Sequence, residues 1–235
     1  MNRFAERKIP SIYDFTRRNA AFLSAFVSLV TLIPTGVQAD VVINGNTITG
    51  GGTYSQVINA TGDLAVTPGS GETITFTNNV VTTGTFNQTG SFVVLEAGTK
   101  NSFGAFFITN NPNNASPHNN NTKMTLNGEL TVNNFHVCKR STAYVDINEG
   151  AILTVNNEFL INQAKNAQGR ITQNGGTVNL NGTGNLLRLG HYPNTGYPSE
   201  YNLNAGTLNV PNTVLHVGWD GYAKLNISGG TANMK

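Results

Sequence analysis

The feature that most constrains this chain is an internal repeat in its C-terminal half. The segments Gly176-Thr177-Val178-Asn179-Leu180 and Gly206-Thr207-Leu208-Asn209-Val210 share a glycine turn followed by a short run of alternating apolar and polar residues, and a weakened copy follows at Gly230. Alternation with a period of two is typical of a β-strand. From residue 40 onward no useful window shows a helical period. The chain is therefore predicted to be all-β and built from repeated strand–turn units.

The spacing of the repeats favours a solenoid. The apolar positions after the turns follow one another at 23, 25, 30 and 24 residues, and they are Leu130, Leu153, Val178, Leu208 and Ala232. A period in the twenties fits a leucine-rich repeat or a parallel β-helix, but the leucine scaffold and helical return segment of the former are not visible. A β-sandwich, the remaining rival, is made of unlike strands. We predict a right-handed parallel β-helix over residues 40–235, with its hand assigned by analogy with known β-helices.

The same alignment extends toward the N-terminus through glycine turns at Gly62, Gly90, Gly128 and Gly150. The distance from Phe92 to Leu130 is 38 residues, longer than one repeat. It contains the tract 110–122, which is rich in Asn, with Pro and Ser, and has no strand character. Such a composition is typical of a loop. We therefore expect 110–122 to be an exposed loop inserted into one repeat.

A second set of aligned residues occupies the later half of each repeat. Its members are Phe135-His136-Val137-Cys138, Phe159-Leu160-Ile161-Asn162, Leu187-Arg188-Leu189-Gly190 and Leu215-His216-Val217-Gly218. The first and third positions are large and apolar and should point inward, and the second should point outward. The fourth is small or Asn and should lie at a turn, so Cys138 is interpreted as a turn-lining thiol. The predicted buried residues are Val178, Leu187, Leu189, Leu208, Leu215, Val217 and Leu225, with Thr177, Arg188, Thr207 and His216 outward.

The composition agrees with stacked strands and turns. Asn makes up roughly one residue in seven, well above ordinary usage, and charged residues make up only 11%. Asn, Thr and Gly are poor helix formers, but they suit tight turns and polar ladders between stacked strands. Regularly placed Val, Ile, Leu and Phe argue against disorder, the alternative interpretation of a polar chain.

Residues 1–39 have the pattern of a signal peptide. A basic segment ends at Arg17-Arg18, an apolar run follows from Ala20 to Ile33, and Val37-Gln38-Ala39 offers small residues for cleavage before Asp40. The whole chain has 14 basic and 12 acidic residues, of which five basic and two acidic residues lie in the leader. Its removal leaves nine basic and ten acidic residues. No basic field remains to attract nucleic acid. We expect an exported protein, secreted, periplasmic or at the cell surface, whose mature chain has no transmembrane segment.

The repeats of residues 122–235, exemplified by Gly206-Thr207-Leu208-Asn209-Val210 and Leu225-Asn226-Ile227-Ser228-Gly229-Gly230-Thr231, resemble those of bacterial autotransporter passengers. They are equally similar to the β-strand repeats of large exported proteins in environmental bacteria. The resemblance implies a parallel β-helix and a place at or beyond the cell surface. The sequence stops inside a repeat, at Asn233-Met234-Lys235. We expect a truncated product whose uncapped C-terminal coil can associate end to end with other molecules.

Motifs for catalysis are missing from the sequence. It contains no Gly-x-Ser-x-Gly elbow, His-Glu-x-x-His pair, P-loop or dinucleotide fingerprint. Many β-helices act on polysaccharides, and a glycosidase needs two carboxylates within ~5–10 Å. The acids here are scattered, with only Asp146 and Glu149 as near neighbours, and these are interpreted as solvated acids at a turn. No catalytic residue, metal site or cofactor is expected.

One surface cluster is the best candidate for ligand binding. Aligning the residues after the second strand brings basic and aromatic side chains along one edge of several coils, together with outward His136. The candidates are Lys139, Arg140, Arg188, His191, Tyr192, His216, Trp219 and Asp220. Aromatic faces and bidentate donors suit a glycan or an acidic polysaccharide. The alternative is that Tyr192 and Trp219 cover the ends of the core and that the basic groups are only solvated.

These patterns predict a secreted or surface-exposed β-helical module with a structural or adhesive role and no catalytic activity. Possible partners are glycans or other cell-surface components. The alternative is a carbohydrate-binding or carbohydrate-active β-helix, resembling a polysaccharide lyase or hydrolase. A pair of carboxylates facing one groove would favour that alternative.

Overall fold

The computed structural model describes residues 41–44, 47–90, 92–108, 122–138, 142–162, 168–184, 186–191 and 198–235. These residues belong to one compact unit, residues 32–235, and contain nineteen β-strands. The expected leader 1–39, with its cleavage site between Ala39 and Asp40, lies outside the described residues, as does the tract 110–121. Thr122, the expected last residue of the inserted loop, is instead the buried first residue of a strand.

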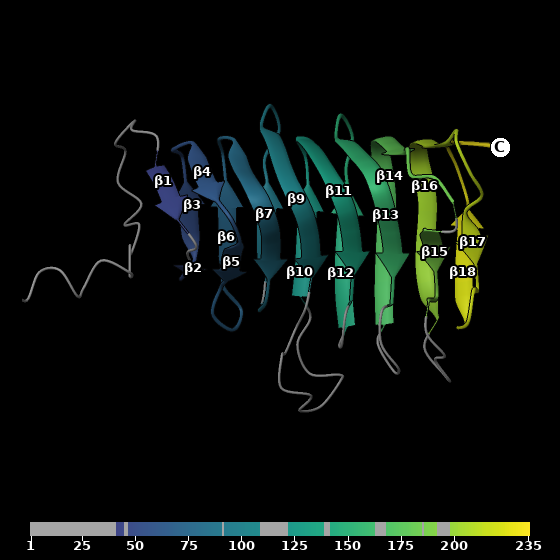
Figure 1. Cartoon of the computed structure of the whole chain (residues 1–235), viewed down its shortest axis with the longest axis horizontal. Helices are drawn as coiled ribbons and strands as arrows, with labels where there is room; N and C mark the ends of the chain where they lie inside the picture. Colours follow the sequence, from purple (N-terminus) through teal and green to yellow (C-terminus); the bar gives the residue numbers. More distant parts are fainter. Residues whose placement is uncertain are drawn as a thin grey trace, which may run out of the picture. The chain divides into compact units, whose positions relative to one another are not determined.

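The strands form three parallel ladders, and each coil of the chain passes through the ladders in turn (Figure 1). The first ladder contains β1 (Val41–Asn44), β4 (Ile58–Thr61) and β19 (Thr231–Met234), with parts of the long strands β7 (Val80–Gln88), β9 (Lys100–Ile108), β11 (Glu129–Val137), β13 (Ile152–Ile161), β14 (Gln168–Leu180) and β16 (Ser199–Val210).

The second ladder contains β2 (Thr47–Thr49), β5 (Leu64–Thr67), the later parts of β7, β9, β11 and β13, and then β15 (Leu187–Leu189) and β17 (His216–Val217). The third contains β3 (Gly52–Tyr54), β6 (Thr73–Phe76), β8 (Phe92–Leu95), β10 (Thr122–Leu126), β12 (Thr142–Ile147), the earlier parts of β14 and β16, and β18 (Ala223–Ile227). The result is a strongly curled, all-parallel sheet, which is the arrangement of a parallel β-helix or related solenoid.

The predicted register is confirmed from Leu130 onward. In the first ladder, Leu130 pairs with Leu153, Leu153 with Val178, Val178 with Leu208, and Leu208 with Ala232. In the second ladder, Phe135 pairs with Phe159 and Phe159 with Leu187, while Arg188 pairs with His216. The two sets of aligned residues are therefore two separate ladders of the same stack.

The predicted alignment is wrong nearer the N-terminus. Leu64, which follows Gly62, pairs with Phe86 in the second ladder. Phe92, which follows Gly90, pairs with Lys123 in the third ladder rather than stacking below Leu130. A coil has several turns, and a glycine can serve at each of them. The glycine therefore identifies a turn but not the ladder that follows it.

Inward-facing side chains form one continuous core. A row of aromatic rings runs through it, with centroid separations of 5.6 Å from Phe86 to Phe106, 5.0 Å from Phe106 to Phe135 and 6.0 Å from Phe135 to Phe159. Of the predicted core residues, Val178, Leu187, Leu189, Leu208 and Leu215 are buried, but Leu225 is only partly buried and Val217 is 45% exposed. Val217 keeps the inward register position but lies in the last described coil, where no further strand packs over it.

The turn predicted at the fourth position of the second ladder is confirmed. Cys138 and Asn162 have φ values of 71° and 70°, and Gly190 and Gly218 have 73° and 79°. Each donates its backbone N–H to the carbonyl at the third position of the coil before, as Asn162 does to Val137 over 2.9 Å. Left-handed backbone favours Gly and tolerates Asn, which explains Gly190, Gly218 and Asn162 but not Cys138. Cys138 is buried, as expected for a turn-lining thiol.

Many asparagines form hydrogen-bonded ladders between coils. Asn209 Nδ2 donates to Asn179 Oδ1 over 2.9 Å, and Asn233 Nδ2 donates to Asn209 Oδ1 over 2.8 Å. A second series joins Asn127, Asn148, Asn174 and Asn204. Stacked amides of this kind link successive strands along the stack, which accounts for much of the unusual composition. Within the described part of the chain, no helix is long and apolar enough to cross a membrane.

Candidate functional site

The second ladder carries the described candidate residues on its outward side. Arg188 lies on β15 between the buried Leu187 and Leu189, and His216 occupies the paired position on β17. His191 follows the turn at Gly190, and Trp219 and Asp220 follow the turn at Gly218. The strand alternation that buries the leucines thus sends Arg188 outward. Lys139, Arg140 and Tyr192 lie outside the described residues.

Four of these side chains contact one another, and we call Arg188, His191, His216 and Trp219 the Arg188 cluster. Arg188 Nη1 lies 3.0 Å from His191 Nδ1. The Arg188 guanidinium carbon lies 4.3 Å from the centroid of the Trp219 ring, in a cation–π arrangement. The rings of His216 and Trp219 meet edge to face, with centroids 4.6 Å apart. The predicted association of basic and aromatic groups is therefore present among the described members.

The charge state of His191 follows from this geometry. A guanidinium can only donate, so Nδ1 of His191 accepts the hydrogen bond from Arg188 and carries no proton. Burial lowers the pKa of His191, and the positive charge of Arg188 lowers it further, while Asp220 and Glu158 act in the opposite direction. His191 is therefore neutral at pH 7, and the fixed positive charge of the cluster belongs to Arg188.

A second group lies farther along the same ladder. His136 pairs with Phe107 in the coil before, and their ring centroids are 4.6 Å apart. His136 Nε2 lies 2.9 Å from Glu158 Oε2. His136 was predicted to point outward, and it has the register of the outward Arg188 through Leu160. It is nevertheless only 5% exposed. Leu160, which pairs with both His136 and Arg188, separates this group from the Arg188 cluster and is itself buried.

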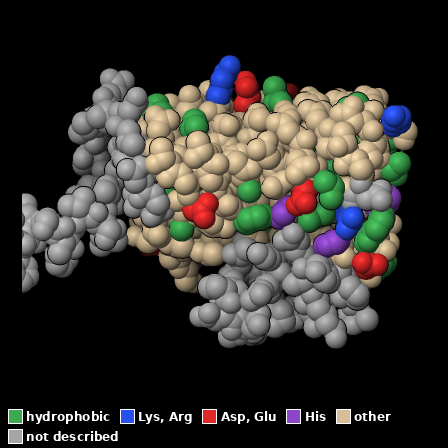
Figure 2. Space-filling view, viewed as in Figure 1, with side chains coloured by type: hydrophobic (Ala, Val, Ile, Leu, Met, Phe, Trp, Pro, Cys, Tyr) green, Lys and Arg blue, Asp and Glu red, His purple; other side chains and the backbone are tan. Residues whose placement is uncertain are grey.

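Sequence reasoning missed Phe107 and Glu158. Phe107 lies in a run of alternating apolar and polar residues, which could have marked it, but the coil that contains it was not correctly aligned with the later coils. Glu158 comes directly before the inward-facing Phe159, which marks it as a residue at the strand's outer side. Figure 2 shows His, acidic, basic and hydrophobic side chains gathered in one band of the visible face, while most of the rest of that face is neither charged nor hydrophobic.

Asp146 and Glu149, the two acids expected to flank a turn, have different surroundings. Glu149 is exposed and lies at the turn, as expected. Asp146 lies near the end of β12, before that turn, and makes an ion pair with Lys123 on β10, so it is not simply solvated. Glu158 and Asp220 are the acids that act on His191. Among the described residues, no group of three or more His, Cys, Asp or Glu side chains is arranged to hold a metal ion.

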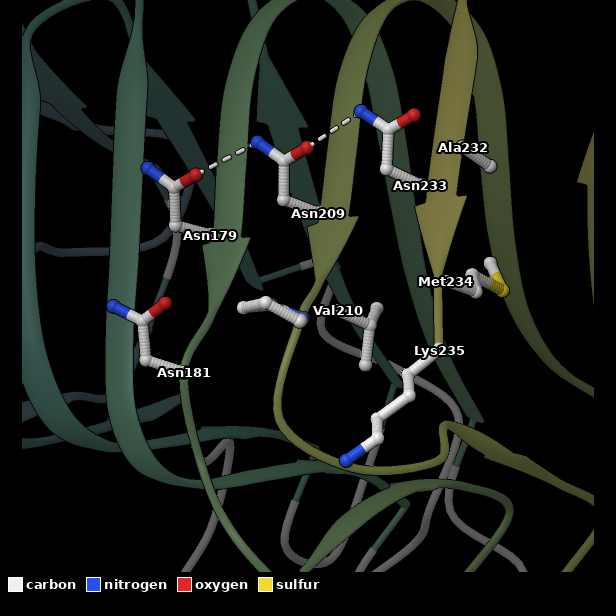
Figure 3. Close-up of a pocket in the computed structure, with 9 residues that line it drawn as sticks. Asn179, Asn181, Asn209, Val210, Ala232, Asn233, Met234 and Lys235 are labelled. Atoms are coloured by element: carbon white, nitrogen blue, oxygen red, sulfur yellow. Dashed lines mark hydrogen bonds between the residues drawn. The ribbon is translucent and has the colours of Figure 1, made fainter.

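A groove of about 800 Å³ lies beside the C-terminal part of the first ladder (Figure 3). Its polar side is the ladder of Asn179, Asn209 and Asn233, and Val210 and Met234 contribute apolar side chains. The amide dipoles of this ladder point the same way, since each Nδ2 donates to the coil before it. The sequence predicted stacked polar residues but not a groove at this place.

The fold and these groups define the chain as a β-solenoid-like protein that carries an outward basic and aromatic cluster. No family model matches the chain, no curated protein is significantly similar to it, and no solved structure matches it.

Proposed function

We propose that this chain is an exported, right-handed parallel β-helix that serves as a structural and adhesive module outside the cell or on its surface, without catalytic activity. The observation that carries the proposal is the unbroken stack. Three ladders share one core, and asparagine ladders join many of the coils on the outside. A stack of this kind holds side chains at fixed intervals over an extended surface, which suits support and attachment. The leader pattern and the resemblance to autotransporter repeats support a place outside the cytoplasm.

Export is tested by expressing the full chain in a bacterium and separating cytoplasmic, periplasmic, surface and secreted fractions. We expect the protein outside the cytoplasm, with a mature N-terminus at Asp40. A matched chain that lacks residues 1–39 should stay in the cytoplasm. Retention of the full chain in the cytoplasm would contradict the proposal.

Adhesion is tested with beads that carry the exported protein. We expect such beads to attach to polysaccharide-coated or cell-coated surfaces more strongly than beads that carry the same protein after heat denaturation, because the binding surface needs the stacked fold. Equal attachment by both kinds of bead would show that the folded solenoid is not an adhesive module.

Carbohydrate binding at the Arg188 cluster is the second candidate function. It is favoured by the contact of Arg188 with Trp219, whose side chain remains 40% exposed. A fixed positive charge beside an aromatic ring suits an acidic sugar, which can pair with the guanidinium and pack against a ring. Trp219 is the chain's single tryptophan, so its fluorescence reports on this place directly.

Titration with acidic oligosaccharides should change Trp219 fluorescence, and Arg188→Gln should weaken that response roughly tenfold or more. Arg170→Gln is the matched control, because Arg170 is also an outward strand arginine but pairs with Glu200 over 2.8 Å. Equal loss in both variants would mean that binding follows net charge and not the cluster. If the unmodified chain released shorter sugars from an oligosaccharide, and Glu158→Gln or Asp220→Asn abolished that release, a carbohydrate-active protein would be favoured instead.

A further inference from the structure

Some asparagines of this chain stand directly before a glycine, and that junction is chemically reactive. An asparagine in this position can lose its amide without an enzyme, because glycine has no side chain to keep its backbone nitrogen away from the asparagine side chain. Both residues of the junction are described in three cases, and these are Asn127-Gly128, Asn174-Gly175 and Asn181-Gly182. The three junctions share one reactive sequence, so their surroundings decide which of them reacts first.

The reaction has two steps. The backbone nitrogen of the glycine bonds to the side-chain Cγ of the asparagine, the bond from Cγ to Nδ2 breaks, and Nδ2 leaves as ammonia with the proton of the attacking nitrogen. One water then opens the resulting succinimide ring and gives aspartate or isoaspartate, so water is the only co-reactant. The first step requires the asparagine amide to turn toward the following backbone nitrogen. Hydrogen bonds that hold the amide in another direction therefore slow the reaction.

The amide of Asn127 is held at both ends. Its Oδ1 accepts a hydrogen bond from Asn148 Nδ2 over 2.8 Å, and its Nδ2 donates to Glu96 Oε2 over 3.2 Å. A bond to a carboxylate is stronger than a bond between two neutral groups. Both bonds must break before this amide can turn.

Asn174 belongs to the same series but is held less firmly. Its Oδ1 accepts from Asn204 Nδ2 over 3.1 Å, while its Nδ2 lies 3.5 Å from Asn148 Oδ1, at the long limit of a hydrogen bond. Asn174 is exposed, whereas Asn127 and Asn181 are half-buried. Exposure alone would therefore make Asn174 the most reactive of the three.

Asn181 has no ladder partner, and the register explains why. Asn179 pairs with Asn209 on the next coil. Continuing this register by two residues places Pro211 beside Asn181, and proline has no side-chain amide to continue a ladder. Asn212 donates to the backbone carbonyl of Asn181 over 2.8 Å, and within the described part of the chain no hydrogen bond holds the Asn181 side chain. The dashed bonds of Figure 3 run along the ladder, and none of them reaches Asn181.

Packing between coils fixes the glycine of this junction. A Cβ atom at Gly182 would lie 2.0 Å from the backbone oxygen of Asn157, in the coil before. Any other residue at this position would force the two coils apart. The reactive junction is therefore a consequence of how closely the chain approaches itself after β14.

We propose that Asn181 is a site of spontaneous deamidation, at which the folded chain forms aspartate or isoaspartate before the other two junctions react. The product places a negative charge between β14 and β15, at a residue that lines the groove beside the asparagine ladder. Isoaspartate also adds one carbon to the main chain at this point. The inference does not depend on the role proposed for the module, because it uses only the fold and the chemistry of the amide.

Peptide mapping by mass spectrometry tests the proposal on the purified chain, kept folded in a mildly alkaline buffer. We expect Asn181 to lose its amide roughly tenfold or more faster than Asn127, where two hydrogen bonds must break, with Asn174 between them. Fastest loss at Asn174 would show that exposure and not the ladder sets the order. That result, or equal rates at the three junctions, would overturn the proposal.

The same chain unfolded in urea is the matched control. The ladder bonds are then broken, so the three asparagines should lose their amides at similar rates. If Asn181 reacted fastest in urea by the same factor as in buffer, the difference would come from the neighbouring sequence and the structural argument would be wrong.

Variants of the ladder give a second test in the folded chain. Asn148→Ala removes the amide that contacts both Asn127 and Asn174, so loss at both should become faster while Asn181 keeps its rate. Pro211→Asn offers Asn181 a partner and should slow its loss. Unchanged rates at Asn127 and Asn174 in the first variant would overturn the role of the ladder. Faster loss at Asn181 in that variant would reveal unfolding, and the comparison of buffer with urea then decides.

Discussion

At the scale of single residues, the core contains a polar contact that the apolar stack must accommodate. Tyr201 is fully buried, with its ring 6.2 Å from that of Phe159, and its hydroxyl donates to Gln173 Oε1 over 2.7 Å. Gln173 Nε2 in turn donates to the backbone carbonyl of Thr207 over 3.1 Å. Burial raises the pKa of Tyr201, so its hydroxyl keeps the proton that it donates. The pair thus joins β14 to β16, strands of two neighbouring coils, through one set of side-chain bonds.

Tyr201→Phe should lower the free energy of unfolding by about 1–3 kcal/mol, because Gln173 Oε1 then stays buried without its donor. Urea denaturation of the variant and the unmodified chain measures the difference. Tyr201→Phe with Gln173→Met removes both partners, so its cost should be less than the sum of the two single changes. Additive costs would show that the two side chains do not stabilise the core as a pair.

The lowered pKa of His191 predicts a pH effect of known sign. An unfolded histidine titrates near pH 6.5, while burial and Arg188 hold the pKa of His191 below that value. As the pH falls below about 6.5, the unfolded chain therefore binds a proton that the folded chain binds less readily, and stability decreases. His191→Gln should make the decrease between pH 7 and pH 5 smaller, as measured by urea denaturation at each pH. Identical pH profiles would contradict the assignment.

At the scale of strands and ladders, asparagine has a positional role. Asn209 lies in the middle of its ladder and both accepts from Asn233 and donates to Asn179, whereas Asn233 makes one bond of this ladder and is exposed. A column of amides therefore joins successive coils only if each position keeps the same side chain.

Asn209→Ala should lower the free energy of unfolding by about 1–2 kcal/mol, because two ladder hydrogen bonds are lost at a partly buried site. Asn233→Ala is the matched control and should cost less, because it removes one bond at an exposed site. Thermal and urea unfolding of both variants measures the two effects. An Asn233→Ala loss as large as that of Asn209→Ala would show that the ladder does not stabilise the fold through these bonds.

The sequence predicted the ladders well where repeats are regular and poorly where turns are ambiguous. The register from Leu130 to Ala232 is confirmed, as is the pairing of Arg188 with His216. Gly62 and Gly90 misled the alignment because positive φ is required at turns before more than one ladder. For the site, alternation predicted that Arg188 faces outward. It could not predict the burial of His136, which depends on packing by Phe107 from a coil whose register was wrong.

At the scale of the whole molecule, pointing inward and being buried are different properties. Period-two alternation predicts the direction of a side chain, but burial also needs other parts of the chain to pack over it. Val178 is buried because strands pair with it on both sides, through Leu153 and Leu208. Among the described residues Val217 pairs with Leu189 on one side, and it is 45% exposed. The sequence alignment therefore gave the correct register for Val217 and an incorrect degree of burial.

The same asymmetry predicts a gradient of local stability along the stack. In a solenoid each coil is stabilised only by its neighbours, so a coil with one neighbour has about half the interface of an internal coil. Residues 223–235 should therefore exchange amide hydrogens much faster than residues 171–217. Hydrogen exchange with mass spectrometry measures both segments in one sample. Fusing a second copy of residues 211–235 after Lys235 should slow exchange in residues 223–235, because the added strands can continue the three ladders. Equal protection of both segments in the unfused chain would show that pairing on one side is enough to stabilise the coil of β17, β18 and β19.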